Sequence, residues 1–353
     1  MQRVPEISSN IDKIKAADPG HPVYLVRLAD NPTKLAYDVV VKAEDKLPAG
    51  IQQSQVTIQW GAKLMKNINN RQVDTKAMAN EETLAFTTAV QSKCDESVRA
   101  SVTAITPDGH IWTKMLFVPG LEGADYFAGP KDRRYVDLEK ISRAAVRMLD
   151  ANRWIEFGKI IAVDIFNANN DRCLVVPELS GACYAQIANL GNMMFNDTGS
   201  MIGLDTYFRN RFANLYAAPE NLEDLNFLLP LKDKAARKKF AQVTTGSFGV
   251  RLKEGIKDPT ISSGTETGMR ASAKGSFDFL MTDPKTHHGS VKNVPFNELD
   301  KLFVPYAVHF EEGIRLGAEQ LRRYLLTKHG DPKRPREFLP AGIWARMQYL
   351  KWV

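Results

Sequence analysis

Cysteines and long apolar runs are scarce in this 353-residue sequence. Its three cysteines, Cys94, Cys173 and Cys183, form no CxxC pair, so the pattern favours neither a disulfide framework nor a structural zinc module. No run of about 18 apolar residues is present, which argues against a transmembrane helix. The first 20 residues also lack the apolar stretch of a secretory signal, so we expect a cytoplasmic protein, or one secreted into a host cell by a signal-independent route.

The charge balance is mildly basic. The chain is 44% hydrophobic and 25% charged, as is usual for a globular domain, and it carries a formal net charge of +6. That charge permits anionic partners such as nucleotides, phosphoinositide surfaces or nucleic acid. Because no zinc-finger, helix-turn-helix or RNA-recognition signature accompanies the basic runs, nucleic acid is disfavoured. Nothing in the sequence fixes an oligomeric state.

Strand patterns dominate the first 120 residues. PVYLVRLAD and KLAYDVVVKAED are rich in β-branched and apolar residues, and a turn at NPT separates them. With an earlier strand before Gly20 they predict a three-stranded antiparallel meander. VRASVTAI and IWTKMLFV, joined by TPDGH, predict a further hairpin and therefore a sheet of five strands.

Two helices are predicted between the meander and this hairpin. Residues 52–69 place an apolar residue at every fourth position, as an amphipathic helix does. Asn80 is the predicted N-cap of the second helix, with Glu81 and Glu82 in its first turn. The sequence from 118 to 132 is rich in glycine and proline and is interpreted as a linker.

The rest of the chain has mostly helical patterns. NRWIEFGKIIAVDIF (152–166) is apolar enough to predict a helix at the centre of a core. NMMFNDTGSMIGLD predicts a short hairpin with DTG at its turn, and further helices are expected at 234–243, near 306–328 and at the C-terminus. The Gly/Ser/Thr-rich stretch 244–276 is predicted to be a loop, either a substrate or activation loop or a disordered segment.

Four polar residues follow these elements in order. Lys42 ends the third strand in the string VVVK, where an ammonium group can reach phosphate oxygens. Asp171 follows the apolar helix in NANNDR and is placed to orient a substrate hydroxyl. Asn192 and Asp205 flank the short hairpin at its open end, and their oxygens suit Mg²⁺. Asp164 is predicted to accept structural hydrogen bonds, with Asn167, Asn169 and Asn170 shaping the turn.

This order of motifs resembles the protein-kinase-like superfamily, in particular the phosphoinositide 3/4-kinases and the HipA-type bacterial kinases. There a helix runs into D-x-x-x-x-N-x-D-R, and here residues 164–172 read DIFNANNDR. The resemblance implies that Lys42 holds ATP phosphates and that Asp171 is the catalytic-loop aspartate. It further implies that Asn192 and Asp205 bind Mg²⁺, and that Asp205 opens the DFG-like motif.

The resemblance also implies an architecture. We expect an α+β, two-lobed protein-kinase-like fold, with a five-stranded antiparallel N-lobe at 1–120 and a larger helical C-lobe at 121–353. The adenine would lie against a hinge, and the phosphates near a glycine loop and the acid that pairs with Lys42. The residues expected at these places are Phe117, Val118 and Gly120 for the hinge, Gly20 for the loop, and Glu82 or its neighbour Glu81 for the acid.

The spacing differs from the kinase pattern in one respect. Asn192 lies 21 residues after Asp171, whereas the kinase signature has five, so residues 173–191 are predicted to be an insertion. Asn189 is the alternative metal ligand. Asp205 is followed by Thr and Tyr in place of Phe and Gly.

The sequence therefore leaves three functions open. The first is an atypical kinase, of the bacterial effector or toxin kind, that transfers phosphate from Mg²⁺–ATP to a protein or lipid hydroxyl. The second is transfer of AMP on the same scaffold. The third is a pseudokinase or interaction protein with a degenerate nucleotide cleft.

Overall fold

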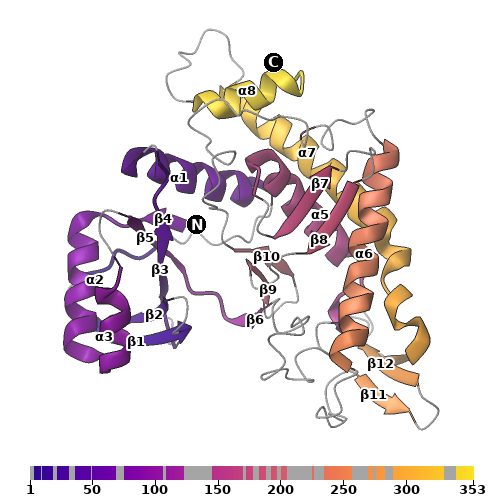
Figure 1. The fold of residues 1–353 in the computed structure, drawn as a ribbon, viewed down its shortest axis with the longest axis horizontal. Coiled ribbons are helices and arrows are strands. Elements are labelled where there is room, and N and C mark those ends of the chain that lie inside the picture. The colour runs from indigo at the N-terminus through magenta and orange to yellow at the C-terminus, as the bar shows by residue number, and fades with distance from the viewer. Residues whose placement is uncertain are drawn as a thin grey trace. The chain divides into compact units, whose positions relative to one another are not determined.

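A computed structural model provides the structure of the chain (Figure 1). It describes residues 4–8, 10–18, 22–31, 36–48, 50–68, 75–105, 109–122, 145–169, 172–177, 183–187, 192–196, 200–204, 225, 234–256, 269–272, 276–282, 289–329 and 339–353. Within these ranges, no helix combines the length and the apolar character that crossing a membrane requires. The chain is an α+β protein with a five-stranded antiparallel sheet near its N-terminus and a mostly helical region after it.

The chain divides into two compact units. The first contains residues 1–118, 205–220 and 332–346, and the second contains 119–204, 221–331 and 347–353. The first break in the chain therefore lies close to the predicted boundary at 120, but each unit also takes up later segments.

Unit 1 is built on the sheet β1-β2-β3-β5-β4. The predicted meander is confirmed as β1 (Ile11–Asp18), β2 (Val23–Leu28) and β3 (Val39–Asp45). β5 (His110–Leu116) pairs antiparallel with β3, and the short β4 (Thr75–Ala77) closes the sheet beyond it.

The two faces of this sheet carry different helices. Helix α1 (Ile51–Ile68) confirms the predicted helix at 52–69, and its Ile58 packs with Ile111 on one face. Helices α2 (Asn80–Lys93) and α3 (Glu96–Thr103) cover the other face, where Phe86 and Val102 join a larger apolar cluster. The helix predicted at Asn80 is thus present, although its N-cap is Ala79.

The strand predicted at 98–105 is wrong, because these residues belong to helix α3. Val98 and Val102 are four residues apart, so a helix turns both toward the core, and Asp95 precedes the helix as its N-cap. The β-branched residues that suggested a strand therefore pack against the core from the helix instead. The fifth strand of the sheet is β4 instead, which is too short to leave a strand pattern in the sequence.

Unit 2 is centred on two closely packed helices, α5 (Ala151–Asn167) and α7 (Ala307–His329). Both were predicted from the sequence. Trp154 of α5 is fully buried among aromatic rings from α6 (Lys234–Ile256), from α7 and from the turn before η7 (Val304–Tyr306), and its indole Nε1 donates to the Met148 carbonyl at 2.7 Å. Phe166, near the end of α5, stacks on Trp352.

Helix α6 (Lys234–Ile256) corrects the predicted loop beginning at 244, because TTGSFGV lies inside the helix. The small residues allow close packing. A Cβ at Gly249 would lie 2.4 Å from the Asp300 carbonyl oxygen, and Thr244 and Thr245 are fully buried. Arg237, from the basic run at 232–239, is also buried, beside Glu311, whereas Lys238 and Lys239 are exposed as predicted for a solvated face.

Three small sheets complete unit 2, together with short helical segments. β6 (Gly120–Glu122), β9 (Met193–Asn196) and β10 (Met201–Gly203) form one sheet, and β7 (Cys173–Pro177) pairs only with β8 (Cys183–Ile187). The third contains β11 (Met269–Ser272), β12 (Ser276–Thr282) and β13 (Gly289–Pro295). The 3-10 helices η6 (Phe296–Lys301) and η7 (Val304–Tyr306) precede α7. The predicted C-terminal helix is α8 (Ala341–Tyr349), whose residues up to Arg346 belong to unit 1.

Candidate active site

The polar loop predicted to carry the chemistry begins where α5 ends. Ala168 caps the helix with a left-handed backbone, φ 54°, and its N–H donates to the carbonyls of Asp164 and Ile165. The Asn169 N–H also donates to the Asp164 carbonyl, at 2.8 Å. The chain therefore turns sharply out of the helix just before Asp171.

A buried ion pair fixes this turn. The Asp164 carboxylate accepts from Arg172 Nε at 2.7 Å and from Arg172 Nη2 at 3.3 Å, and Asn169 Nδ2 donates to it at 3.1 Å. Asp164 is 2% exposed and Arg172 is fully buried, so neither charge is shared with bulk water. The predicted structural role of Asp164 is confirmed, and so is the part of Asn169 in shaping the turn.

Arg172 also donates hydrogen bonds to the two residues that flank the β9–β10 hairpin at its open end. Its Nη1 donates to the Asn192 carbonyl, and its Nη2 donates to the Leu204 carbonyl at 2.9 Å. The Leu204 N–H donates to the Asn192 carbonyl at 2.8 Å, which extends the hairpin ladder by one pair. One guanidinium therefore joins the residue after Asp171, the predicted metal ligand Asn192, and the residue before Asp205.

The hairpin is fixed to α5 at its other end. The Met201 N–H donates to the Glu156 carboxylate at 2.9 Å, and Glu156 pairs with Arg153 one turn earlier in α5. Met193, Phe195, Met201 and Ile202 are all buried, so the hairpin is packed as well as hydrogen-bonded. The hairpin predicted around DTG is thus confirmed in its two strands.

Two of the predicted site residues, Asp171 and Asp205, lie outside the described residues, as does Gly20. Asn192 is described and half-buried at the open end of the hairpin. Among the described residues, no group of three His, Cys, Asp or Glu side chains is arranged to hold a metal ion. The metal ligands expected from the sequence, Asn192 with Asp171 and Asp205, therefore stay a prediction.

The predicted phosphate lysine lies in unit 1, on the α1 face of the sheet. Lys42 is directly opposite Thr113 of β5, and its ammonium pairs with Glu44 at 3.0 Å. Glu44 points to the same face because it is two residues further along the strand. Sequence reasoning did not consider Glu44 as a partner, although its spacing within the strand could have indicated it.

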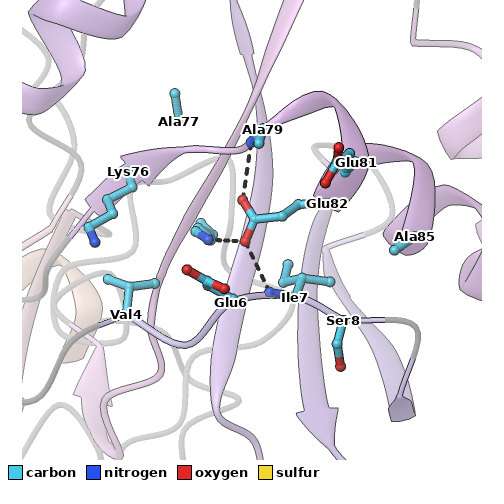
Figure 2. A pocket seen from close by; sticks show the side chains of 11 residues that line it. Val4, Glu6, Ile7, Ser8, Lys76, Ala77, Ala79, Glu81, Glu82 and Ala85 are labelled. Atoms are coloured by element: carbon cyan, nitrogen blue, oxygen red, sulfur yellow. Dashed lines mark hydrogen bonds and ion pairs between the residues drawn. The ribbon is translucent and has the colours of Figure 1, made fainter.

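Glu82, the predicted partner of Lys42, pairs with a different lysine. Its Oε1 accepts from Lys114 Nζ and from the Ile7 N–H at 3.1 Å, and its Oε2 accepts from the Ala79 N–H at 3.1 Å (Figure 2). Burial opposes the charge on Glu82, but these hydrogen bonds outweigh it and hold the pKa of Glu82 below its usual value. Lys114 was missed because a single lysine in an apolar strand gives no sign of its partner.

The predicted hinge residues have backbone partners. The Phe117 N–H donates to the Asp38 carbonyl at 2.9 Å, and its ring packs on Tyr37. Val118 is half-buried, and Gly120 begins β6, opposite Asn196 of β9. The Phe117 N–H is therefore already engaged within the protein.

No protein-family model matches the chain. No curated protein matches it at a significant level.

Proposed function

We propose that this chain is an atypical kinase-like phosphotransferase that moves the γ-phosphoryl group of ATP, with Mg²⁺, to a hydroxyl of a protein or a lipid. The observation that carries the proposal is the Arg172 bridge. It ties the chain positions next to Asp171 and Asp205 to Asn192, which are the three positions that a kinase-like site requires. The bridge supports the proposal because it places the neighbouring residues Arg172 and Leu204 at Asn192, although they are far apart in the sequence.

The proposed roles follow from the chemistry of each side chain. Asp171 orients the acceptor hydroxyl and accepts its proton, and Asn192 and Asp205 hold the metal. Mg²⁺ supplies charge neutralisation at the phosphate oxygens when it is bound. Lys42 contacts the nucleotide phosphates, with Glu44 orienting its ammonium group. The two-lobed kinase-like architecture is part of the same proposal.

The Asp164–Arg172 pair has a supporting role in this proposal. Catalysis of phosphoryl transfer depends mostly on positioning, so the loop and the hairpin have to keep a fixed spacing. Arg172 is fully buried and directed by a carboxylate that also accepts from Asn169, which favours one arrangement of all three segments. The overall charge of +6 further favours anionic nucleotides and phosphoinositide surfaces as ligands.

One observation supports the alternative of an interaction protein. The segment between Asp171 and Asn192 includes the two-stranded sheet β7–β8, which pairs with no other described strand and packs beside α6. An added hairpin at this point fits the predicted insertion. It could equally serve to bind a partner in a pseudokinase.

Transfer of label from ATP distinguishes these functions. We expect γ-labelled ATP with Mg²⁺ to label the chain itself, a test protein or phosphoinositide vesicles, and Asp171→Asn to lower the rate by about 10²–10⁴-fold. Label from the α-phosphate instead would indicate AMP transfer. Binding of ATP without transfer of either label would favour the interaction protein.

A further inference from the structure

A pocket opens beside the N-terminus of α2, within unit 1 (Figure 2). It encloses about 740 Å³, a volume that suits a small ligand. The N-terminal segment contributes Val4, Glu6 and Ile7, and Lys76 of β4 and Lys114 of β5 form another side.

This pocket is separate from the predicted phosphate site. Lys114 is directly opposite Val41, the residue before Lys42, and cross-strand partners point to the same face of a sheet. Lys42 and Lys114 therefore lie on opposite faces. A ligand in the pocket would lie on the α2 face, whereas Lys42 is on the α1 face.

The base of the pocket contains a cation that is already neutralised. Lys114 is 4% exposed and pairs with Glu82, whose other oxygen is bonded to the Ala79 N–H. Lys76 is directly opposite Lys114, an arrangement of like charges that costs free energy unless an anion offsets it. The Glu82 carboxylate offsets the charge of Lys114, which is one of these two lysines.

Charges of both signs remain around the pocket. Within the described part of the chain, Lys76, Glu6 and Glu81 form no ion pair, either with one another or with other residues. Lys76 and Glu6 both line the pocket, and Figure 2 shows the Glu6 carboxylate near the Glu82 carboxylate, with the Lys76 side chain extending along another side. Apolar groups from Val4 and Ala85 line the same space.

The start of α2 adds hydrogen-bond donors. Its N-cap is Ala79, which has no side-chain acceptor, and the Ala79 N–H itself donates to the Glu82 carboxylate. The backbone N–H groups at a helix start favour an anion, and Ala79, Glu81 and Glu82 all line the pocket. A ligand carboxylate placed between this helix start and Lys76 would meet donors from both.

We propose that this pocket binds a small zwitterionic ligand of the amino-acid type. Its carboxylate would pair with Lys76 and the start of α2, its ammonium with Glu6, and its side chain would contact the apolar lining. A simple anion would meet two carboxylates that repel it, and a simple cation would meet Lys76. A ligand that carries both charges satisfies the two sides of the pocket at once.

Calorimetry on the full chain tests this proposal. The probes are a mixture of L-amino acids at about 1 mM each, the same amino acids as methyl esters, and the same amino acids N-acetylated. We expect heat of binding only from the unmodified amino acids, and Lys76→Gln and Glu6→Gln each to weaken binding by about tenfold. Circular dichroism of both variants should match the wild type, because both side chains are exposed.

Lys42→Gln is the matched control on the other face of the sheet. It should leave amino-acid binding unchanged while weakening ATP binding, so failure of this proposal and failure of the phosphotransferase proposal give different results. No heat from any probe would overturn the inference. Equal binding of esters or N-acetyl derivatives would also overturn it, because the pocket would then not require both charges.

Discussion

Replacing Asp164 with asparagine is expected to lower the free energy of unfolding by about 3–5 kcal/mol. Arg172 is fully buried, and the substitution removes the carboxylate that pairs with its guanidinium. The side chain keeps nearly the same shape, so the loss reports the charge and not a cavity. Denaturant unfolding of the two proteins measures it.

The control for this substitution is Glu312→Gln on the surface of α7. Glu312 pairs with Arg315 at 2.6 Å, but both side chains are 41% exposed, so we expect a loss below about 1 kcal/mol. The double variant Asp164→Asn, Arg172→Met should lose less than the sum of its two single variants, because each removes the same interaction. Similar losses for Asp164→Asn and Glu312→Gln would contradict the structural role given to the buried pair.

Gly158→Ala is expected to destabilise unit 2 by about 3 kcal/mol, at the upper end of the usual cost of overpacking. An added Cβ would lie 2.3 Å from the Phe310 carbonyl oxygen and 2.7 Å from the Ile314 amide nitrogen. Both atoms belong to the backbone of α7, so no side chain can move aside. The helices α5 and α7 would have to separate, which would disturb the aromatic core around Trp154.

Gly246→Ala in α6 is expected to change the stability in the opposite direction. The nearest atom to its added Cβ is a Val304 methyl group at 3.9 Å, so the alanine fits. Because alanine favours helix more than glycine does, we expect a gain of about 0.5–1 kcal/mol. Thermal unfolding of the two variants compares them directly, and a loss for both, or for neither, would show that close helix packing does not decide the outcome.

Regular elements could be predicted wherever one periodicity dominated the sequence. α1, α5 and α7 have apolar residues at helical spacing, and the β9–β10 hairpin has apolar strands on both sides of DTG. Two elements were mistaken because residue type was weighed above spacing. Val98 and Val102 suggested a strand but lie in α3, and TTGSFGV suggested a loop but lies in α6, where small residues meet η6.

For the candidate site, the sequence indicated the order of the motifs along the chain but not the contacts between them in space. Motif order predicts Asp171, Asn192 and Asp205 as site residues, which stays a prediction, whereas the predicted structural role of Asp164 is confirmed. The bridge from Arg172 to the Asn192 and Leu204 carbonyls was not predictable, because backbone acceptors leave no pattern in a sequence. The pairing of Glu82 with Lys114 was also missed, since α2 covers the face of the sheet opposite Lys42.

The most direct measurement of the central proposal is a calorimetric titration of ATP with and without Mg²⁺. We expect Mg²⁺ to strengthen ATP binding to the wild type, and Asp205→Asn and Asn192→Ala to reduce that strengthening by about tenfold or more. Asp164→Asn should reduce it too wherever the protein stays folded, because the hairpin ends lose their common anchor. ATP binding that is absent, or that is equally strong in wild type and Asp205→Asn with Mg²⁺ present, would contradict a metal–nucleotide site at the Arg172 bridge.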